Sequence, residues 1–390
     1  MDARLHGSKL ITLINTVAPG EQGAVSAIAA QLPDRDGFTA LFCSCHYDLN
    51  RLGKGLRSAG HDRIVAAAAS RAIGPGGFLT QGITGFHLPA DRFKVADALI
   101  EDVTQFGLPD ARQIVQSLLR RLRCGADSDW PHLFAILLVD ATPRCEERLV
   151  AALGTELGGV PLIGGSAGDD YFNPTGRNAA ATRVLHEGHA VRGGAAFCII
   201  ASRDPVLALC HHHYVPGRRR LVVTDADPDR RLVREIDGQN ALKVYAAACG
   251  LKPTTRDLGA FASHPLMIKV GGQYFARGML RIYDIYEDGS LEFACAIEPG
   301  LVVTVARPVD MVERLIGTFA AMRRTLGSME LIIGFDCASR TAYMERHGLT
   351  EAVSAVFRKN RVVGFSTLGE QYNAIHVNNS FTCLGVAAPK

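Results

Sequence analysis

Apolar and polar residues along this chain follow both the helical and the strand period, which predicts helices and strands mixed throughout. The run Thr39–Cys43 is short and apolar, as expected of a strand. Apolar residues recur every three to four positions over residues 93–106, 111–123, 239–249 and 308–326, which predicts four amphipathic helices. Pro109 and Asp110 mark a helix start, and Gly250 and Gly327 mark helix ends.

Two short segments predict tight turns between antiparallel strands. One is 186–189 (HEGH), and the other is 287–290 (EDGS), which joins the runs 280–286 and 291–297. A chain that combines hairpins with strand–helix–strand units is expected to form mixed or antiparallel sheets flanked by helices. The predicted fold class is therefore α+β.

Two distant segments share one order of elements, namely strand, turn, helix and strand. They span residues 133–170 and 331–371, with Asp140 and Asp336 closing their first strands. Gly164 and Ser166 then correspond to Gly364 and Ser366. The pattern predicts two related domains produced by internal duplication, and chance similarity of such units is the alternative.

The most polar connection, residues 216–238, suggests where these two domains meet. We expect an N-terminal domain over residues 1–215 and a C-terminal domain over residues 230–390.

Composition narrows the functional class. Hydrophobic residues make up 47% and charged residues 21% of 390 residues, as in a globular protein with a substantial core. A net charge of +3 argues against a nucleic-acid-binding surface or a polybasic membrane anchor. The ten cysteines form no C-x-x-C pair, and the chain shows neither a signal peptide nor a membrane-length apolar run. We expect a cytoplasmic protein.

One catalytic motif is present and is contradicted by its context. Residues 164–168 (GGSAG) match G-x-S-x-G, the turn that carries the nucleophile of α/β-hydrolases, with Ser166 in the reactive position. That turn requires a helix directly after the serine, whereas residues 169–176 (DDYFNPTG) read as a loop. A glycine-rich turn against a pocket is the preferred interpretation. Phosphate-binding, dinucleotide-binding and H-E-x-x-H motifs do not occur, so we expect no enzyme.

Histidines are the other source of chemistry. His211, His212 and His213 end an apolar stretch, and alternate residues of a strand would place His211 and His213 on one face. His264 and His376 also lie at or within predicted strands beside apolar residues. A neutral imidazole in apolar surroundings is a ligand that haem iron accepts.

Several segments resemble the FIST family in order and spacing. VPLIGGSAGDD and HEGHAVRGGAAF resemble its N-terminal domain; REIDGQNALKVYAAACG, HPLMIKVGGQYFARGM, FDCASR and VVGFSTLGEQYNAIHVNNSFT resemble its C-terminal domain. The resemblance implies sensing of small ligands in bacterial signal transduction. Four segments also show a narrower resemblance within the family, namely HYVPGRRRLVVT, DPDRRLVREIDG, FASHPLMIKVGGQYF and GFSTLGEQYNAIHVNNSFT. They resemble the stand-alone haemoproteins that sense nitric oxide (NosP).

The narrower resemblance implies haem b on a histidine, and a histidine kinase or a cyclic-di-GMP enzyme as partner in trans. We expect His213 to bind the iron, because an apolar stretch, Tyr214 and a rigid Pro-Gly segment surround it. His264, with Met267 as apolar wall, is the second choice, and His376 is the third. The expected function is haem-based detection of nitric oxide or of haem itself. A FIST sensor of an amino acid or similar metabolite without haem, and a serine hydrolase using Ser166, are the alternatives. The sequence is compatible with a homodimer.

Overall fold

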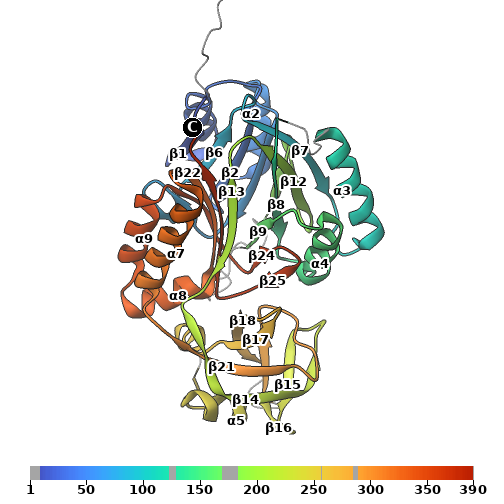
Figure 1. The fold of residues 1–390 in the computed structure, drawn as a ribbon, viewed down its shortest axis with the longest axis vertical. Helices are drawn as coiled ribbons and strands as arrows, with labels where there is room; N and C mark the ends of the chain where they lie inside the picture. The colour runs from blue at the N-terminus through green and yellow to red at the C-terminus, as the bar shows by residue number, and fades with distance from the viewer. Residues whose placement is uncertain (1–8, 123–128, 169–182, 256, 284–288, 390) are drawn as a thin grey trace, which may run out of the picture.

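The computed structural model describes residues 9–122, 129–168, 183–255, 257–283 and 289–389, arranged as four sheets with helices (Figure 1). Three six-stranded sheets form the larger part of the molecule, and one eight-stranded sheet forms a smaller part beside it. The α+β class with mixed and antiparallel sheets is confirmed.

Each of the three six-stranded sheets is built mainly from one repeat of the chain, and only the third repeat is interrupted. The first repeat contains β1 (Thr12–Thr16), α1 (Gly20–Ala29), β2 (Phe38–Ser44), α2 (Leu49–Ser58), β3 (Ile64–Ala69), β4 (Ala72–Gly74), β5 (Gly77–Leu79) and β6 (Ile83–Leu88). The second contains β7 (Phe93–Ile100), α3 (Leu108–Leu122), β8 (His132–Asp140), α4 (Glu146–Leu157), β9 (Leu162–Ala167), β10 (Val184–His186), β11 (His189–Val191) and β12 (Ala195–Ser202). The third contains β13 (Val206–His211), α7 (Met311–Leu326), β22 (Met329–Cys337), α8 (Ala338–His347), α9 (Thr350–Lys359), β23 (Val362–Thr367), β24 (Glu370–Tyr372), β25 (Ile375–Val377) and β26 (Phe381–Ala387).

The three repeats have the same strand order. Neighbouring strands follow the orders β1-β6-β2-β3, β7-β12-β8-β9 and β13-β26-β22-β23. Of the four strands in each order, only the last two run parallel to each other. This order confirms the predicted duplication of residues 133–170 and 331–371. The structure adds a third copy, within residues 12–88, that the sequence did not reveal.

The fifth and sixth strands of each sheet come from another repeat. The hairpin β4–β5 pairs with β23, the hairpin β24–β25 pairs with β9, and the hairpin β10–β11 pairs with β3. Each repeat therefore gives a hairpin to one neighbour and receives one from the other. The exchange closes into a ring, so none of the three sheets is complete without a second repeat.

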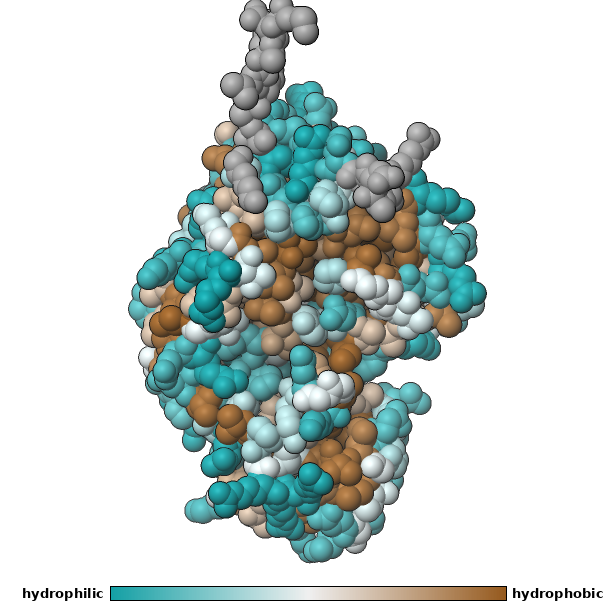
Figure 2. All heavy atoms as spheres, in the orientation of Figure 1, coloured by the Kyte–Doolittle hydropathy of each residue, from teal (hydrophilic) through white to brown (hydrophobic). Residues whose placement is uncertain are grey.

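One shared core lies between the inner faces of the three sheets. Equivalent inward positions carry Phe42, Leu138 and Phe335, and the rings of Phe42 and Phe335 meet edge to face at 6.0 Å. Helices cover the outer faces, with α1 and α2 on the first sheet, α3 and α4 on the second, and α7 and α9 on the third. On the face drawn in Figure 2, apolar residues gather toward the middle and hydrophilic residues dominate the helical flanks.

The eight-stranded sheet is an insertion into the third repeat, between β13 and α7. It contains β14 (Tyr214–Asp227), β15 (Leu232–Ile236), β16 (Gln239–Asn240), α5 (Ala241–Cys249), α6 (Leu258–Ala262), β17 (Leu266–Val270), β18 (Gln273–Arg277), β19 (Met279–Tyr283), β20 (Ser290–Phe293) and β21 (Val302–Pro308). The polar segment 216–238, expected to be a connection, instead forms most of β14 and β15. Its three consecutive arginines, Arg218, Arg219 and Arg220, remain exposed, while Leu221 and Val223 turn inward and are buried.

Most predicted elements are present, and one helix is wrong. Helices form at α3, α5 and α7, and the hairpin at 186–189 has the left-handed residues Glu187 and Gly188 at its turn. Part of the second hairpin, residues 284–288, lies outside the described residues, but its flanking strands β19 and β20 do pair. The predicted helix over 93–106 is instead the strand β7. All eight residues of β7 pair with β12, and this pairing decides the structure of the segment. The helical period did not decide it, because alanine and leucine fit that period in a helix and in a strand alike.

Three further expectations change in detail. Asp140 and Asp336 are one residue out of register, because Asp140 pairs with Ala167 whereas Asp336 pairs with Ser366. They therefore face opposite sides of their sheets. The expected turn after Asp336 contains the whole helix α8. The glycine-rich turn at Ser166 is a buried strand as far as Ala167.

Glycines let the parallel strands of the repeats approach one another. A Cβ on Gly364 would collide with the carbonyl oxygen of Gly334 on the neighbouring strand. We expect Gly364→Ala to lower the free energy of unfolding by about 1–3 kcal/mol, the usual cost of overpacking. Gly317→Ala, in α7 with no atom within 4 Å of the added methyl, should be neutral or stabilising. Urea unfolding of both variants tests this, and equal stability would contradict the constraint.

Candidate functional site

Buried polar side chains collect where the eight-stranded sheet meets the three-sheet part. We call this group the polar junction; it consists of His213, Tyr214, Arg277, Asp336, Arg340, Glu370, His376, Asn378 and Asn379. All of these side chains are less than a tenth exposed. So many buried polar groups are uncommon in a protein core, because each loses its hydration and requires a partner.

The turn between β25 and β26 lies at the centre of the polar junction. Asn379 adopts a left-handed backbone conformation (φ 50°), which asparagine tolerates better than most residues. Its amide nitrogen donates to the hydroxyl of Tyr214 at 3.3 Å, linking the two parts of the molecule. Gly278 and Gly369 lie against this turn, and a side chain on either would collide with Asn379 or His376.

An ion pair forms one wall of the junction. Asp336 is the next-to-last residue of β22, and Arg340 lies in the first turn of α8. Their i, i+4 spacing places Nε of Arg340 2.6 Å from Oδ1 of Asp336. Both side chains are fully buried. One oxygen of Asp336 (Oδ2) and one nitrogen of Arg340 (Nη2) have no hydrogen-bond partner among the described residues.

Glu370 is a second buried carboxyl group of the junction. The hydroxyl groups of Thr367 and Ser380 donate to it, the latter at 2.5 Å. Burial raises the pKa of Glu370 to about 8, and the charge of Asp336 adds to the increase, while the two hydroxyl groups oppose it. Glu370 is therefore mostly protonated and uncharged at neutral pH.

Arg277 is the cation of the junction that lacks a close counter-ion. It is 8% exposed and donates through Nη1 to the carbonyl oxygen of His376 at 2.9 Å. Its Nε has no acceptor, and no carboxylate of the described residues lies within ion-pair distance. Within the described part of the chain, neither side-chain atom of Asn378 has a partner, and Oδ1 of Asn379 has none. The junction thus presents one buried cation and several unused amide groups.

Of the residues proposed from the sequence, His213, Tyr214 and His376 belong to the junction, and Met267 packs beside it. The rings of His213 and Tyr214 lie 4.1 Å apart, and Tyr214 packs in one small cluster with Met267. The guanidinium of Arg340 lies 3.3 Å from Nδ1 of His213. A guanidinium can only donate, so Nδ1 accepts and the proton of the neutral ring is on Nε2. Burial, together with Arg340, holds the pKa of His213 far below its usual range.

This tautomer bears on the expected iron ligand. A haem-ligating histidine presents a lone pair at one nitrogen and normally donates its other N–H to a carbonyl or carboxylate. In His213 the lone pair of Nδ1 is engaged by Arg340, and the N–H at Nε2 has no acceptor among the described residues, so the residues around it do not fit a haem-iron ligand.

His264 has the arrangement that His213 lacks. Its Nδ1 lies 2.9 Å from the carbonyl oxygen of Ala260. A carbonyl only accepts, so Nδ1 carries the proton and Nε2 keeps a lone pair. The side chain is partly exposed, at the end of α6. His264 therefore fits the orientation expected of an iron ligand.

His376 differs from both. It is buried in β25, and neither ring nitrogen has a partner among the described residues. Burial lowers the pKa of His376, although Glu147 nearby opposes this, so the ring is neutral.

The first two residues of the triple histidine occupy another place. His211 and His212 line a surface pocket of about 700 Å³ between β13 and α7. His211 Nδ1 lies 2.8 Å from the hydroxyl of Thr318, and His212 donates through Nε2 to the carbonyl oxygen of Tyr274 at 2.9 Å.

Ser166 is buried in β9 rather than presented on a turn. Its hydroxyl accepts a hydrogen bond from the amide of Gln371 at 2.9 Å, and among the described residues no histidine is bonded to it. The residues after position 168, where the sequence predicts a loop, lie outside the described residues. The geometry of Ser166 does not fit an activated nucleophile.

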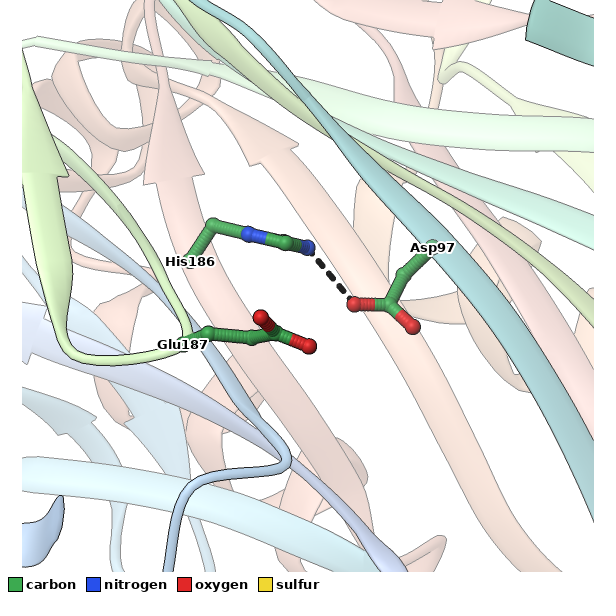
Figure 3. A group of neighbouring side chains, drawn as sticks. All are labelled: Asp97, His186 and Glu187. Carbon is green, nitrogen blue, oxygen red and sulfur yellow. Dashed lines mark hydrogen bonds and ion pairs between the residues drawn. The ribbon is translucent and has the colours of Figure 1, made fainter.

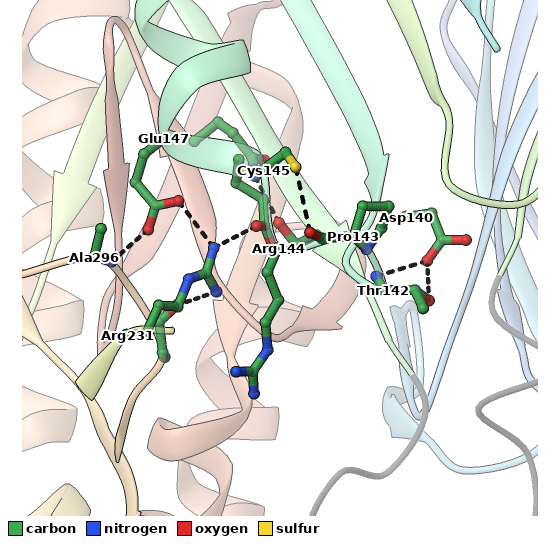
Figure 4. Close-up of polar contacts among 12 residues, drawn as sticks. Asp140, Thr142, Pro143, Arg144, Cys145, Glu147, Arg231 and Ala296 are labelled. Carbon is green, nitrogen blue, oxygen red and sulfur yellow. Dashed lines mark hydrogen bonds and ion pairs between the residues drawn. The ribbon is translucent and has the colours of Figure 1, made fainter. Parts of the chain in front are cut away.

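A second set of polar contacts joins the two parts of the molecule (Figure 4). Its charged groups lie close enough to His376 to act on the pKa of that histidine. Arg231 of the eight-stranded sheet binds Glu146 at 2.5 Å and Glu147 at 2.9 Å, both in the first turn of α4. Glu147 also accepts from the backbone nitrogen of Ala296 at 2.7 Å. We call this group the Arg231 latch.

Sequence reasoning missed Arg277 and the role of Arg340. Arg277 is a single charge in the stretch FARG, and Arg340 shares the stretch FDCASR, otherwise apolar or small, with Asp336. An arginine in such a window is a usable signal, because arginine is rarely buried without a specific partner.

Comparison with known proteins identifies the family. The FIST N domain model matches residues 37–239, and the FIST C domain model matches residues 241–373. The chain therefore belongs to the FIST family. FIST domains are sensory signalling domains that bind small ligands, and the family is typically non-catalytic.

The other comparisons add little. No curated protein matches the chain. The crystal structure of cyanuric acid hydrolase from A. caulinodans aligns over 97% of this chain and 99% of that chain, with 9% identity and a TM-score of 0.37. A TM-score this low supports no conclusion about activity. Among the described residues, no helix is long and apolar enough to cross a membrane.

The raised pKa of Glu370 predicts a pH-dependent stability. An unfolded glutamate releases its proton near pH 4.5, whereas folded Glu370 keeps it to about pH 8. Between these values the unfolded state binds fewer protons, so stability falls as pH rises, by about 1 kcal/mol per unit. Glu370→Gln removes this term, so its stability relative to the unmodified protein should increase from pH 5 to pH 8.

Denaturant unfolding at several pH values measures this difference. Glu351→Gln is the control, because Glu351 is exposed and Arg358 lowers its pKa. It should gain no relative stability with rising pH. Parallel curves for Glu370→Gln and the unmodified protein would contradict a protonated Glu370.

Proposed function

We propose that the protein is a FIST sensor whose ligand is a small carboxylate-bearing metabolite, such as an amino acid, bound at the polar junction. The observation that carries the proposal is the buried Arg277, which has an unused Nε–H and no carboxylate within ion-pair distance among the described residues. Burial of a guanidinium without a close anion is unfavourable, and a ligand carboxylate would remove that cost.

The remaining groups of the junction suit the rest of such a ligand. Asn378 and Asn379 offer amide donors and acceptors for a polar substituent. Glu370 is uncharged at neutral pH, and Asp336 is paired with Arg340, so neither cancels the positive charge of Arg277. Glu146 and Glu147, which both bind Arg231, together outweigh its positive charge and lie near the junction. Neither of them accepts a hydrogen bond from Nε of Arg277.

The position of the junction supports a signalling role. Arg277 and Tyr214 belong to the eight-stranded sheet, whereas Asn378, Asn379 and His376 belong to the three-sheet part. A ligand that binds both sets favours one arrangement of the two parts over another. We propose that a partner histidine kinase or cyclic-di-GMP enzyme reads this arrangement in trans.

Removal of the Arg277 charge should abolish ligand binding. A panel of amino acids and small mono- and dicarboxylates should contain a compound that raises the unfolding temperature of the purified protein. In Arg277→Met, which keeps the apolar stem and removes the cation, the affinity should fall at least about tenfold. Isothermal titration calorimetry measures the change.

Arg234→Met is the matched control. Arg234 lies on β15 of the same sheet, pairs with Asp225 and Asp227, and has an exposed side chain. Its loss should leave the affinity unchanged. A panel without any binder, or a binder unaffected by Arg277→Met, argues against a carboxylate ligand at this site.

The second candidate function is haem-based sensing of nitric oxide, and the bond between His264 Nδ1 and Ala260 favours it. Haem b on His264 would supply an iron site for the gas, with Met267 and Tyr214 in the neighbouring apolar cluster. His264 keeps an unprotonated Nε2 and is held in place by the carbonyl group, which are the two properties a ligating ring requires.

Haem reconstitution distinguishes the two candidates. If haem binds, the protein shows a Soret band that nitric oxide shifts. His264→Ala loses the band, while His213→Ala retains it, because Nδ1 of His213 faces the guanidinium of Arg340 and cannot take the proton that Nε2 would have to release. A protein that stays colourless after reconstitution contradicts the haem candidate. Loss of the band in His213→Ala alone would contradict the assignment to His264.

A further inference from the structure

Far from the polar junction, the second repeat brings three ligating side chains together (Figure 3). Asp97 comes from β7, His186 is the last residue of β10, and Glu187 follows it in the turn of the hairpin β10–β11. Their donor atoms all lie within 4.8 Å of one another. His186 Nε2 is 2.6 Å from Asp97 Oδ2, and this nitrogen donates because an ionised carboxylate only accepts.

The three side chains are held in place by the hairpin exchange. The hairpin pairs with β3 of the first sheet, with His186 opposite Val65, while Asp97 belongs to the second sheet, opposite Cys198. Asp97 is 9% exposed, and the side chain of His186 is 13% exposed. Glu187 is exposed and leaves one side of the group open to solvent.

The other repeats show that the fold does not require these residues. In register, the positions equivalent to Asp97 are Leu13 and Ala208, both packed against the shared core. The positions equivalent to His186 are Gly74 and Tyr372. At these equivalent positions the other two seams carry neither a carboxylate nor an imidazole, so packing alone does not explain why the third seam has both.

Glu187 adds to the case. It occupies the first left-handed position of the turn, with φ 47°, where asparagine, aspartate or glycine is favoured. A glutamate there is unfavourable for the turn, and its carboxylate faces that of Asp97, which repels it. A cation between the two carboxylates would relieve this repulsion.

The donor set indicates the metal. One imidazole and two carboxylates are ligands of Zn²⁺ and related transition metals, whereas Mg²⁺ and Ca²⁺ prefer oxygen alone. Arg121 lies on the far side of Asp97, where its guanidinium is 4.0 Å from Oδ1 of Asp97. The guanidinium also donates to the backbone carbonyl oxygen of Asp97 at 2.8 Å. It leaves Oδ2 for a metal and reduces the net charge of the group to −1.

We propose that Asp97, His186 and Glu187 form a site for a divalent transition-metal ion of the zinc class, separate from the sensory ligand. Binding moves the proton of His186 from Nε2 to Nδ1, so that Nε2 offers its lone pair in place of the hydrogen bond to Asp97. His189, opposite His186 in the hairpin and on the same face, lies within reach as a fourth ligand. The metal would tie the second repeat to the first sheet.

Calorimetric titration of the full chain with Zn²⁺ alone tests the site. We expect one Zn²⁺ per chain at this site, and no comparable binding of Mg²⁺. His186→Gln and Glu187→Gln should each weaken this binding at least about tenfold. Glu187 is exposed, so its variant should fold normally even if His186→Gln does not. The control is His61→Gln, another partly exposed histidine, which should leave the affinity unchanged.

Cobalt separates this site from adventitious binding by cysteines. Co²⁺ at an imidazole and two carboxylates shows weak visible bands without a thiolate-to-metal charge-transfer band. That spectrum, lost in Glu187→Gln, supports the proposal. A charge-transfer band at the first equivalent, or Zn²⁺ affinity unchanged in both His186→Gln and Glu187→Gln, would overturn it.

Discussion

The exchange of hairpins between repeats is the constraint on which the rest of the structure depends. Every six-stranded sheet ends in two strands taken from another repeat, and the three exchanges close into a ring. A ring of this kind holds the three inner faces against one another and fixes the apolar core between them. It also sets the register at the seams, so that side chains far apart in sequence, such as Asp97 and His186, meet with defined geometry.

The polar junction depends on the same ring in a less direct way. The hairpin β24–β25 belongs to the second sheet, and the chain then turns back to enter β26 of the third sheet. That return turn contains Asn378 and Asn379, and its backbone bonds to the start of α8 through Ser380 and Cys337. The buried amide groups are therefore held by two sheets at once. Such preorganisation lowers the cost of ordering a binding site.

Local patterns in the sequence were sufficient for much of the fold. Helices α3 and α7 have clear apolar stripes and end signals, and the repeat of residues 133–170 was visible because both copies keep their glycines. The third copy was hidden because its strand β3 is a run of alanines and its glycines lie elsewhere. The strand β7 was mistaken for a helix because its partner β12 lies about a hundred residues away. No local pattern reports such a distant pairing.

The site was less accessible from sequence than the fold. Sequence reasoning named His213, Tyr214 and Met267, which do cluster, but the direction of a single hydrogen bond from Arg340 decides which nitrogen of His213 is protonated. Hydrogen-bond direction depends on tertiary placement of a residue 127 positions away. The same holds for Arg277, whose significance is the absence of a close anion among the described residues rather than any motif around it.

The eight-stranded sheet leaves and re-enters the ring at one place. The chain passes into it between His211 and Tyr214 and returns between Pro308 and Met311, and these two crossings are adjacent, since Tyr214 pairs with Pro308 and the nitrogen of Val309 bonds to His213. An insertion held by a double-stranded stem can be exchanged or remodelled in evolution while the ring is retained. A change in the insertion would therefore alter the contacts proposed for the ligand at the polar junction and leave the three-sheet ring in place.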